Sequence, residues 1–174
     1  MVGLGNPGRT YERTRHNVGF LVAEELARRH GGSWRMRKKA EAAPITLGFQ
    51  DVTLLKPTTF MNNSGSALAG HNTAENFIVV HDDLDLPEGD VRVKVGGGAG
   101  GHNGLRSVIG RHGPDFVRVR VGIGRPPPGM GVTDYVLGKM NSAVRGAVPR
   151  AADAVEAVLE DGPEVAMNRF NARF

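Results

Sequence analysis

The sequence predicts an α/β fold: a single domain in which a twisted mixed β-sheet is flanked by helices in a three-layer α/β/α arrangement. Segments with helical periodicity alternate with short apolar or alternating segments along the chain. Neither an internal repeat nor a low-complexity tract interrupts this alternation. The length of 174 residues favours one domain over residues 1–174, which can bury a core without disulfides or metals.

The residue pattern of the first half of the sequence predicts strands around one long helix. Met1–Leu4 begins a strand, and Thr14–His30 has the spacing of an amphipathic helix that ends at Gly31. The apolar face of that helix consists of Val18, Leu21, Val22 and Leu26. Further strands are expected at Ser33–Lys38, Pro44–Phe49 and Val52–Lys56. Asn62–Gly70 is expected to form a short helix.

The second half continues the alternation. The apolar, β-branched run Phe77–His81 is typical of a buried strand. Val91–Val95 and Val117–Ile123 alternate apolar with basic residues and should be strands, with a helix at Gly104–Arg111 between them. Two helices, Ala143–Leu159 and Glu164–Arg169, close the chain, and Pro149 should end the first of them early or kink it.

The composition of the chain excludes several classes of function. The net charge of +4 favours a polyanion partner such as nucleic acid, although a soluble protein can also simply be basic. Aromatic residues make up only 6%, which argues against stacking of successive bases. The absence of cysteine excludes thiol catalysis and Cys-type zinc sites. We expect no membrane span and no signal peptide, so a cytoplasmic protein is the simplest interpretation.

Gly3, Gly5 and Gly8 match the dinucleotide-binding pattern G-x-G-x-x-G, but their context does not fit it. Only two residues precede Gly3, helical periodicity starts well after Gly8, and the next strand is basic where an acidic residue is expected. The glycines are better explained by a turn or a close approach of the chain. That turn should place Asn6 at the rim of the sheet, where α/β proteins bind ligands.

Four polar clusters offer groups for chemistry, at residues 6–17, 58–65, 79–87 and 96–104. None contains a nucleophilic serine motif, which favours attack by water with a histidine as general base. Asp82 or Asp83 follows a buried strand and could orient His16, although these aspartates could instead form a turn. A metal site made of His81, Asp82, Asp83 and Asp85 is a weaker alternative, because strand neighbours point to opposite faces.

The remaining polar groups allow two interpretations each. Asn62 and Asn103 could stabilise an oxyanion or could cap helices. His102 could be catalytic or a loop residue, and Gly96–Gly101 could cradle phosphate or form a flexible flap. Basic residues on alternate strand positions form either a solvated face or a stripe that binds phosphate, and the glycine run next to Lys94 favours the stripe. These residues are Arg92, Lys94, Arg118 and Arg120.

Taken together, these stretches resemble the bacterial peptidyl-tRNA hydrolase family. The matching motifs are VGLGNPGRTYERTRHNVGF, LLKPTTFMNNSG, VVHDDLDLPEGDVRVKVGGGAGGHNGLRSV, VRVRVGIGRP and YVLGKM, and they occur in family order from residue 2 to about residue 140. The resemblance implies a phosphorylase/hydrolase-like fold. It also implies metal-free and cofactor-free hydrolysis of the ester between peptide and tRNA, which returns the tRNA of prematurely released peptidyl-tRNA to translation.

The resemblance also implies roles for individual residues. His16 matches the general base that activates water, Asp82 the group that stabilises its basic form, and Asn6 the residue that helps separate N-blocked from free aminoacyl-tRNA. Substrate contacts are implied for Tyr11, Phe60, Asn62 and Asn103, with Met61 and His102 lining the same cleft. Contacts to tRNA phosphate are implied for Lys94 and Arg120, with Lys139 nearby.

Other functions stay open at this point. A non-enzymatic RNA-binding module would need the basic residues but not His16 or Asp82, and some proteins of this fold serve organellar RNA processing. An NADP-dependent oxidoreductase is a third class. The Ser66–Ile78 stretch is shorter than the usual helix and loop of the family. We expect a monomer.

Overall fold

The structure is a computed structural model that describes residues 1–71 and 77–172. Residues 72–76, within the short Ser66–Ile78 stretch, lie outside the described ranges. Seven strands form one mixed sheet in the order β2-β3-β4-β1-β5-β7-β6. The strands are β1 (Val2–Gly3), β2 (Arg35–Arg37), β3 (Ala40–Leu47), β4 (Gln50–Pro57), β5 (Ile78–Asp83), β6 (Val91–Val95) and β7 (Val117–Gly122). Parallel pairing joins β4, β1, β5 and β7, and antiparallel pairing adds the outer strands.

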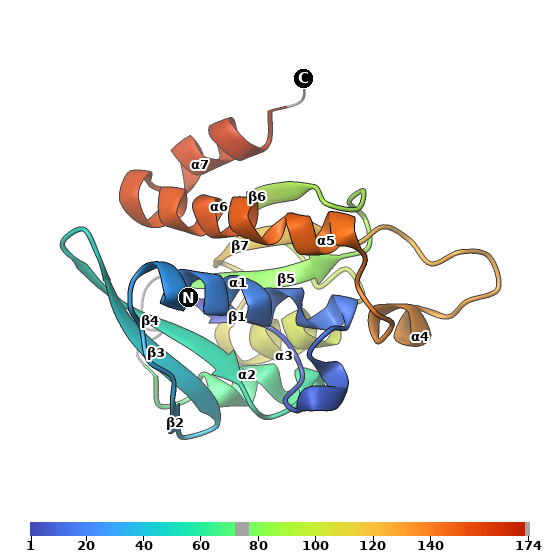
Figure 1. The fold of residues 1–174 in the computed structure, drawn as a ribbon, viewed down its shortest axis with the longest axis horizontal. Helices are drawn as coiled ribbons and strands as arrows, with labels where there is room; N and C mark the ends of the chain where they lie inside the picture. Colours follow the sequence, from blue (N-terminus) through green and yellow to red (C-terminus); the bar gives the residue numbers. More distant parts are fainter. Residues whose placement is uncertain (72–76, 173–174) are drawn as a thin grey trace.

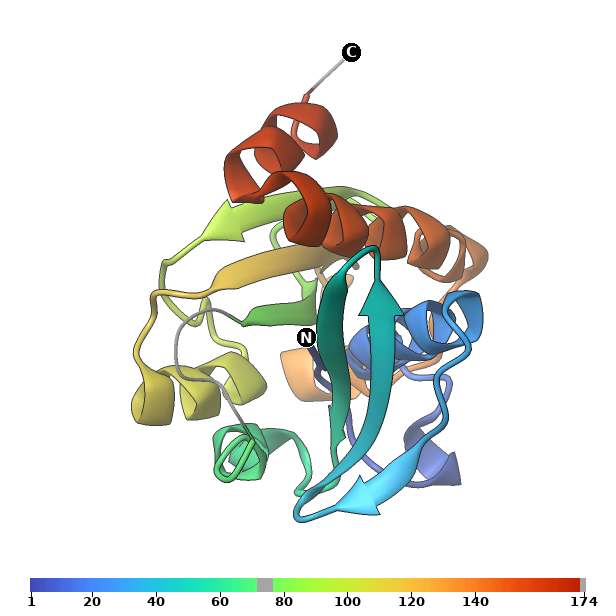
Figure 2. The same cartoon turned by 90° about the vertical axis from the view of Figure 1, so that its left-hand side faces the viewer.

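Helices cover both faces of this sheet, which confirms the predicted fold class (Figure 1). The α-helices are α1 (Val18–Arg29), α2 (Ser64–Ala67), α3 (Asn103–His112), α4 (Val132–Val136), α5 (Ser142–Gly146), α6 (Val148–Asp161) and α7 (Pro163–Phe170). Three 3₁₀ segments are η1 (Arg9–Tyr11), η2 (Arg15–Asn17) and η3 (Met61–Asn63). Figure 2 shows α6 and α7 on the opposite side of the sheet from α2 and α3. Across the described ranges, no helix has both the length and the apolar character needed to cross a bilayer.

Several predicted boundaries are wrong, for local reasons. The strand predicted at Pro44–Phe49 is β3, which starts four residues earlier because it pairs with β4 from Ala40 to Leu47. The α-helix predicted from Thr14 starts at Val18, since the preceding residues form η2. The helix predicted at Ala143–Leu159 is divided into α5 and α6, and Pro149 stands in the first turn of α6, so the proline begins a helix as expected of its fixed φ.

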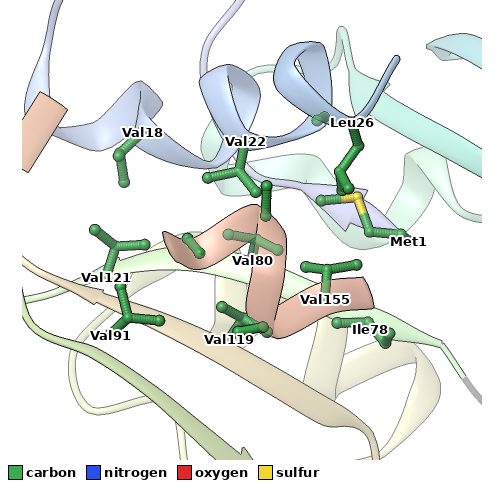
Figure 3. Packing of buried hydrophobic residues seen from close by; sticks show 14 of the residues in the cluster. Met1, Val18, Val22, Leu26, Ile78, Val80, Val91, Val119, Val121 and Val155 are labelled. Atoms are coloured by element: carbon green, nitrogen blue, oxygen red, sulfur yellow. The ribbon is translucent and has the colours of Figure 1, made fainter. Parts of the chain in front are cut away.

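The main core lies between α1, α6 and one face of the sheet. Val18, Val22 and Leu26 of α1 point toward the strand valines, as the spacing of the sequence predicts, and α6 contributes Val155 (Figure 3). In a smaller core on the other face of the sheet, Leu105 of α3 packs with residues of the strands. Both faces of the central strands are therefore buried, which leaves the ends of the strands as places for a site.

The glycines of the first motif allow close packing of α1 on β1. A Cβ atom on Gly3 would lie 2.1 Å from the carbonyl oxygen of Gly19 in α1, and one on Gly5 would lie 2.7 Å from the ring of Phe20. Gly8 has a φ of 100°, which turns the chain after Pro7. The chain leaves β1, turns, and returns in α1 over the same strand. Its turn lies at the carboxyl end of β1, between the ends of β4 and β5.

Candidate active site

Three polar side chains meet at the carboxyl end of β5. Nδ1 of His16 lies 2.8 Å from Oδ2 of Asp82, and Nε2 of His102 lies 2.8 Å from Oδ1 of the same carboxylate. His16 belongs to η2, directly before α1, and His102 is the N-cap residue of α3. Asp82 therefore links the helical layers on the two faces of the sheet. All three side chains line a cavity of about 690 Å³.

A backbone amide determines where the protons of this cluster lie. The N–H of Leu105 donates to Nδ1 of His102 at 3.2 Å, so the neutral His102 ring carries its proton on Nε2 and donates it to Asp82. The second carboxylate oxygen accepts a hydrogen bond from the protonated Nδ1 of His16. The lone pair of His16 is then on Nε2, which has no hydrogen-bond partner within residues 1–71 and 77–172.

The carboxylate stays ionised. Burial would raise the pKa of Asp82, but the hydrogen bonds that both imidazole rings donate, and the charge that either ring carries when it is protonated, outweigh burial and hold this pKa well below its usual range. Burial, together with the nearby His102, lowers the pKa of His81 to about 4. His81 is thus neutral at physiological pH and adds no positive charge beside the cluster.

His16, Asp82 and His102 form a group whose potential metal-ligand atoms lie within 4.8 Å of one another. Zinc would need the lone pair of His102 on Nε2, and therefore its proton on Nδ1. The amide of Leu105 already donates to that Nδ1. The donor set consequently fits a chain of proton donors and acceptors better than it fits a metal ion.

The alternative metal site in HDDLD does not assemble. Asp83 accepts from Nε of Arg120 at 2.8 Å, and Asp85 pairs with Arg125. Nδ1 of His81 donates to the backbone carbonyl of the next residue at 2.8 Å. The three carboxylates proposed to share a metal are therefore each engaged elsewhere, although Nε2 of His81 has no partner in the described part of the chain.

Asn6 lies between the cluster and the neighbouring loop. Its Oδ1 accepts from the backbone N–H of Met61 at 2.7 Å, and the residue is 7% exposed at the cavity wall. Phe60, directly before Met61, has a φ of 59°, a conformation that residues other than glycine rarely adopt. The bond from Met61 to Asn6 helps to hold this strained turn in place.

The side chains with implied substrate contacts line the same cavity. Tyr11 and Phe60 meet edge to face with ring centroids 6.3 Å apart, and Phe60 is 53% exposed. Asn62 and Asn103 are exposed at the cavity, and within the described ranges neither caps a helix. His102 takes the capping role at α3 that the sequence offered to Asn103. Oδ1 of Asn103 accepts from Arg106 at 3.3 Å, so the NH₂ groups of both asparagines are available to a ligand.

The basic residues divide into different roles. Lys94 and Arg120 line the cavity, and Nε of Arg120 is held by Asp83 while its terminal nitrogens have no described partner. Arg118 is 2% exposed and donates to the carbonyls of Gly97 and Gly98, so it holds the glycine loop instead of facing solvent. Lys139 is exposed but outside the cavity lining, and its backbone pairs with Thr14.

Sequence reasoning missed α4. This helix lies beyond the carboxyl end of β5 (Figure 1) and contributes Val132, Thr133 and Val136 to the cavity wall, followed by Leu137. The spacing of Val132 and Val136 was a helical signal, but the preceding proline-rich loop concealed it. α4 thus adds apolar side chains to a cavity whose lining also holds the polar residues described above.

The arrangement suits the attack of water on an acyl carbon. His16 presents an unprotonated nitrogen, the buried carboxylate behind it would stabilise the imidazolium that forms, and amide donors stand nearby. The adjoining cations suit a polyanionic substrate. A dinucleotide site is not supported, because Gly3 and Gly5 are packed against α1.

Comparisons with known proteins agree with this chemistry. The family model described as peptidyl-tRNA hydrolase matches residues 1–174. A peptidyl-tRNA hydrolase of Rubrobacter xylanophilus is 70% identical over 172 residues, which cover 99% of each chain. One from Rhodococcus erythropolis is 50% identical and covers 98% of this chain and 96% of its own. The crystal structure of peptidyl-tRNA hydrolase from Acinetobacter baumannii superposes with a TM-score of 0.91 at 38% identity and covers 98% of this chain and 93% of its own.

Proposed function

The chain belongs to the peptidyl-tRNA hydrolase family and is an ester hydrolase that acts on peptidyl-tRNA, and we propose that His16, Asp82 and the amides around them carry out the reaction. The observation that supports this assignment most directly is the 2.8 Å bond from His16 to Asp82, which leaves Nε2 of His16 free at the cavity.

In the proposed reaction, Nε2 of His16 accepts a proton from water. The oxygen of that water attacks the carbonyl carbon of the ester that joins the peptide to the terminal ribose. The resulting oxyanion accepts hydrogen bonds from amide N–H groups, for which Asn62 and Asn103 are the candidates. Asp82 stabilises the imidazolium during this step. When the C–O bond breaks, the imidazolium returns the proton to the ribose oxygen, which leaves free tRNA and a peptide carboxylic acid; this acid then loses the second proton of the water to solvent.

The remaining residues would bind the substrate. Asn6 would contact the N-acyl group next to the ester, and the half-buried ring of Tyr11 and the exposed ring of Phe60 would cover the terminal base or the peptide. Lys94 and the free terminal nitrogens of Arg120 would bind phosphate. A role for Lys139 requires the tRNA to extend beyond the cavity, because this side chain lies outside the lining.

The proposal includes a cellular setting. A substrate produced during translation implies a cytoplasmic enzyme that recycles tRNA from prematurely released peptidyl-tRNA. The edge strand β6 supports a monomer. On its open side, the N–H of Val93 donates to Oδ1 of Asn171 and the carbonyl of Val93 accepts from Nδ2 of Asn171, both at 2.8 Å. These backbone groups are therefore not free to pair with a strand of a second chain. Light scattering of the purified protein tests the monomer directly.

Replacement of His16 by Ala tests the assignment. We expect at least a hundredfold loss of kcat for release of N-acetyl amino acid from N-acetyl-aminoacyl-tRNA, because the general base is removed. The control is His30→Ala, which removes a half-buried histidine bonded to Glu156 far from the cavity and should leave kcat unchanged. Wild-type turnover by His16→Ala would exclude this mechanism. Binding of tRNA without hydrolysis by the wild type would instead indicate an RNA-binding module.

A further inference from the structure

Asn17 stands at the N-cap position of α1 but does not cap the helix. Asparagine at this position ordinarily accepts a hydrogen bond from the first turn, which stabilises the helix. Here the side chain makes no capping bond, although the residue is buried, at 2% exposed. Its amide is therefore used for something other than helix stability.

The amide of Asn17 is bonded to the backbone of Asn6 on both sides. The N–H of Asn6 donates to Oδ1 of Asn17 at 2.9 Å, and Nδ2 of Asn17 donates to the carbonyl oxygen of Asn6 at 2.8 Å. Because one backbone group is a donor and the other an acceptor, the orientation of the amide is not ambiguous. This pair fixes the peptide groups on both sides of the Asn6 Cα atom.

With its backbone fixed, the Asn6 side chain has one possible orientation. Its oxygen must face the N–H of Met61, to which it is bonded at 2.7 Å. Rotation of the amide by 180° would place NH₂ against N–H, and two donors would then face each other. Of the polar groups of Asn6, only Nδ2 has no partner in the described part of the chain. Asn6 is thus held as a hydrogen-bond donor at the wall of the cavity that contains His16.

A fixed donor distinguishes the two kinds of aminoacyl ester. In an N-blocked ester the α-nitrogen is part of an amide, whose carbonyl oxygen accepts a hydrogen bond. In a free aminoacyl ester the α-nitrogen is an ammonium, which only donates. A freely rotating asparagine could serve either ligand, whereas a fixed donor binds the first and repels the second.

We propose that Asn17 is a positioning residue that acts through Asn6 and locks it as a donor, and that this lock produces the preference for N-blocked esters. The proposal rests on the proposed function, since it requires that Asn6 contacts the N-acyl group. It adds a residue that does not itself touch the substrate and a physical reason for the selectivity.

The test compares two substrates, N-acetyl-aminoacyl-tRNA and the same aminoacyl-tRNA with a free amine. For Asn17→Ala we expect the ratio of their kcat/KM values to fall at least tenfold, with the loss on the blocked substrate appearing mainly in KM. In a background of Asn6→Ala, the same substitution should change the ratio less than twofold if Asn17 acts through Asn6. An unchanged ratio in Asn17→Ala, or an equal fall in both backgrounds, would overturn the proposal.

Two further variants separate positioning from folding. Asn141→Ala removes an asparagine that does cap a helix, at α5, where its Oδ1 accepts from Val144 at 3.0 Å. It should lower the unfolding temperature and leave the substrate ratio unchanged. Asn17→Asp keeps the size and the acceptor but loses the donor to the Asn6 carbonyl, so it supplies the same test if Asn17→Ala does not fold, with a fall in the ratio expected again and an unchanged ratio overturning the proposal.

Failure of this inference is distinguishable from failure of the proposed function. A wild-type protein that does not hydrolyse N-acetyl-aminoacyl-tRNA refutes the function, whatever Asn17 does. A wild type that hydrolyses and discriminates, together with an Asn17→Ala variant that discriminates equally well, refutes only the lock.

Discussion

Replacement of Asp82 by Asn should move the proton of His16 to the wrong ring nitrogen. The substitution keeps the shape of the side chain but converts one oxygen acceptor into an NH₂ donor. The Leu105 amide keeps His102 as an Nε2 donor, so the remaining oxygen must face His102. The new NH₂ group then faces Nδ1 of His16, and this nitrogen must accept. The proton of His16 is thereby shifted to Nε2, where the base is needed.

The size of the effect follows from what is lost. A histidine in this tautomer cannot take a proton from water, and the imidazolium loses its facing carboxylate. General-base catalysis and the correct tautomer together contribute about 10³- to 10⁴-fold, or about 4 to 5 kcal/mol at about 1.36 kcal/mol per decade. KM should change little, since Asp82 is 3% exposed and stands behind the histidines.

The assay is release of N-acetyl amino acid from saturating N-acetyl-aminoacyl-tRNA, with kcat compared at several pH values on each side of neutrality. The tautomer explanation has its own test in a double-variant cycle. With His102→Leu, the amide introduced at position 82 can rotate and offer its oxygen to His16, so Asp82→Asn should cost at least tenfold less in that background. A kcat within tenfold of wild type for the single variant would refute the role of Asp82. An equal cost in both backgrounds would refute the tautomer reasoning.

Four other predictions follow from the site and the packing around it. The pKa of His81 is lowered from 6.5 to about 4, so between these pH values the unfolded chain binds a proton that the folded chain does not. The free energy of unfolding should therefore fall by up to about 1.4 kcal/mol per pH unit as the pH drops from 6.5 to 4. Urea titrations should show that His81→Gln flattens this slope. Paired Lys94→Gln and Arg120→Gln should raise KM and reduce the slope of log affinity for tRNA against log salt by about 0.9 per lost phosphate contact, with kcat at saturation retained. Gly19→Ala should destabilise the protein by about 3 kcal/mol or more in thermal unfolding, because its Cβ would lie 2.5 Å from a backbone oxygen. Gly110 lies inside α3 with open space around it, so Gly110→Ala should stabilise the protein by up to about 1 kcal/mol. Dialysis against EDTA should leave kcat unchanged, and a loss restored by added metal would contradict a metal-free reaction.

The sequence was most informative where the structure depends on local pattern. Val91–Val95 forms a strand with both predicted ends, because apolar and basic residues alternate there without interruption. The start of β3 was not predictable in this way. Its first residues include Ala40 and Glu41, which have no strand pattern, and they are extended because β4 pairs with them. Pairing across a sheet is a property of two segments and leaves little trace in either one.

The same distinction holds for the site. That an aspartate after a buried strand would face His16 followed from the position of the strand end and from the family resemblance, and the structure brings the two side chains together. The second bond of that aspartate, to His102, depends on the N–H of Leu105 at the start of α3. The sequence predicts a helix start at this position, but with Asn103 as the candidate cap. Which of two adjacent polar residues caps a helix is decided by the path of the loop before it, and that path is set by tertiary contacts.

The first glycine motif acquires a different meaning from this geometry. In a dinucleotide-binding protein such glycines make room for a pyrophosphate. Here Gly3 makes room for the carbonyl oxygen of Gly19, which would lie 2.1 Å from a Cβ atom, and the space is occupied by protein. The close contact of β1 and α1 brings the start of the helix, including Asn17, up to the loop after the strand, where its amide reaches both backbone groups of Asn6. Larger residues at these glycines would separate the strand from the helix and lengthen both bonds. If Asn17 positions Asn6 as proposed, the glycines influence substrate choice indirectly, through the short distance that they allow between Asn17 at the helix start and Asn6 at the strand end.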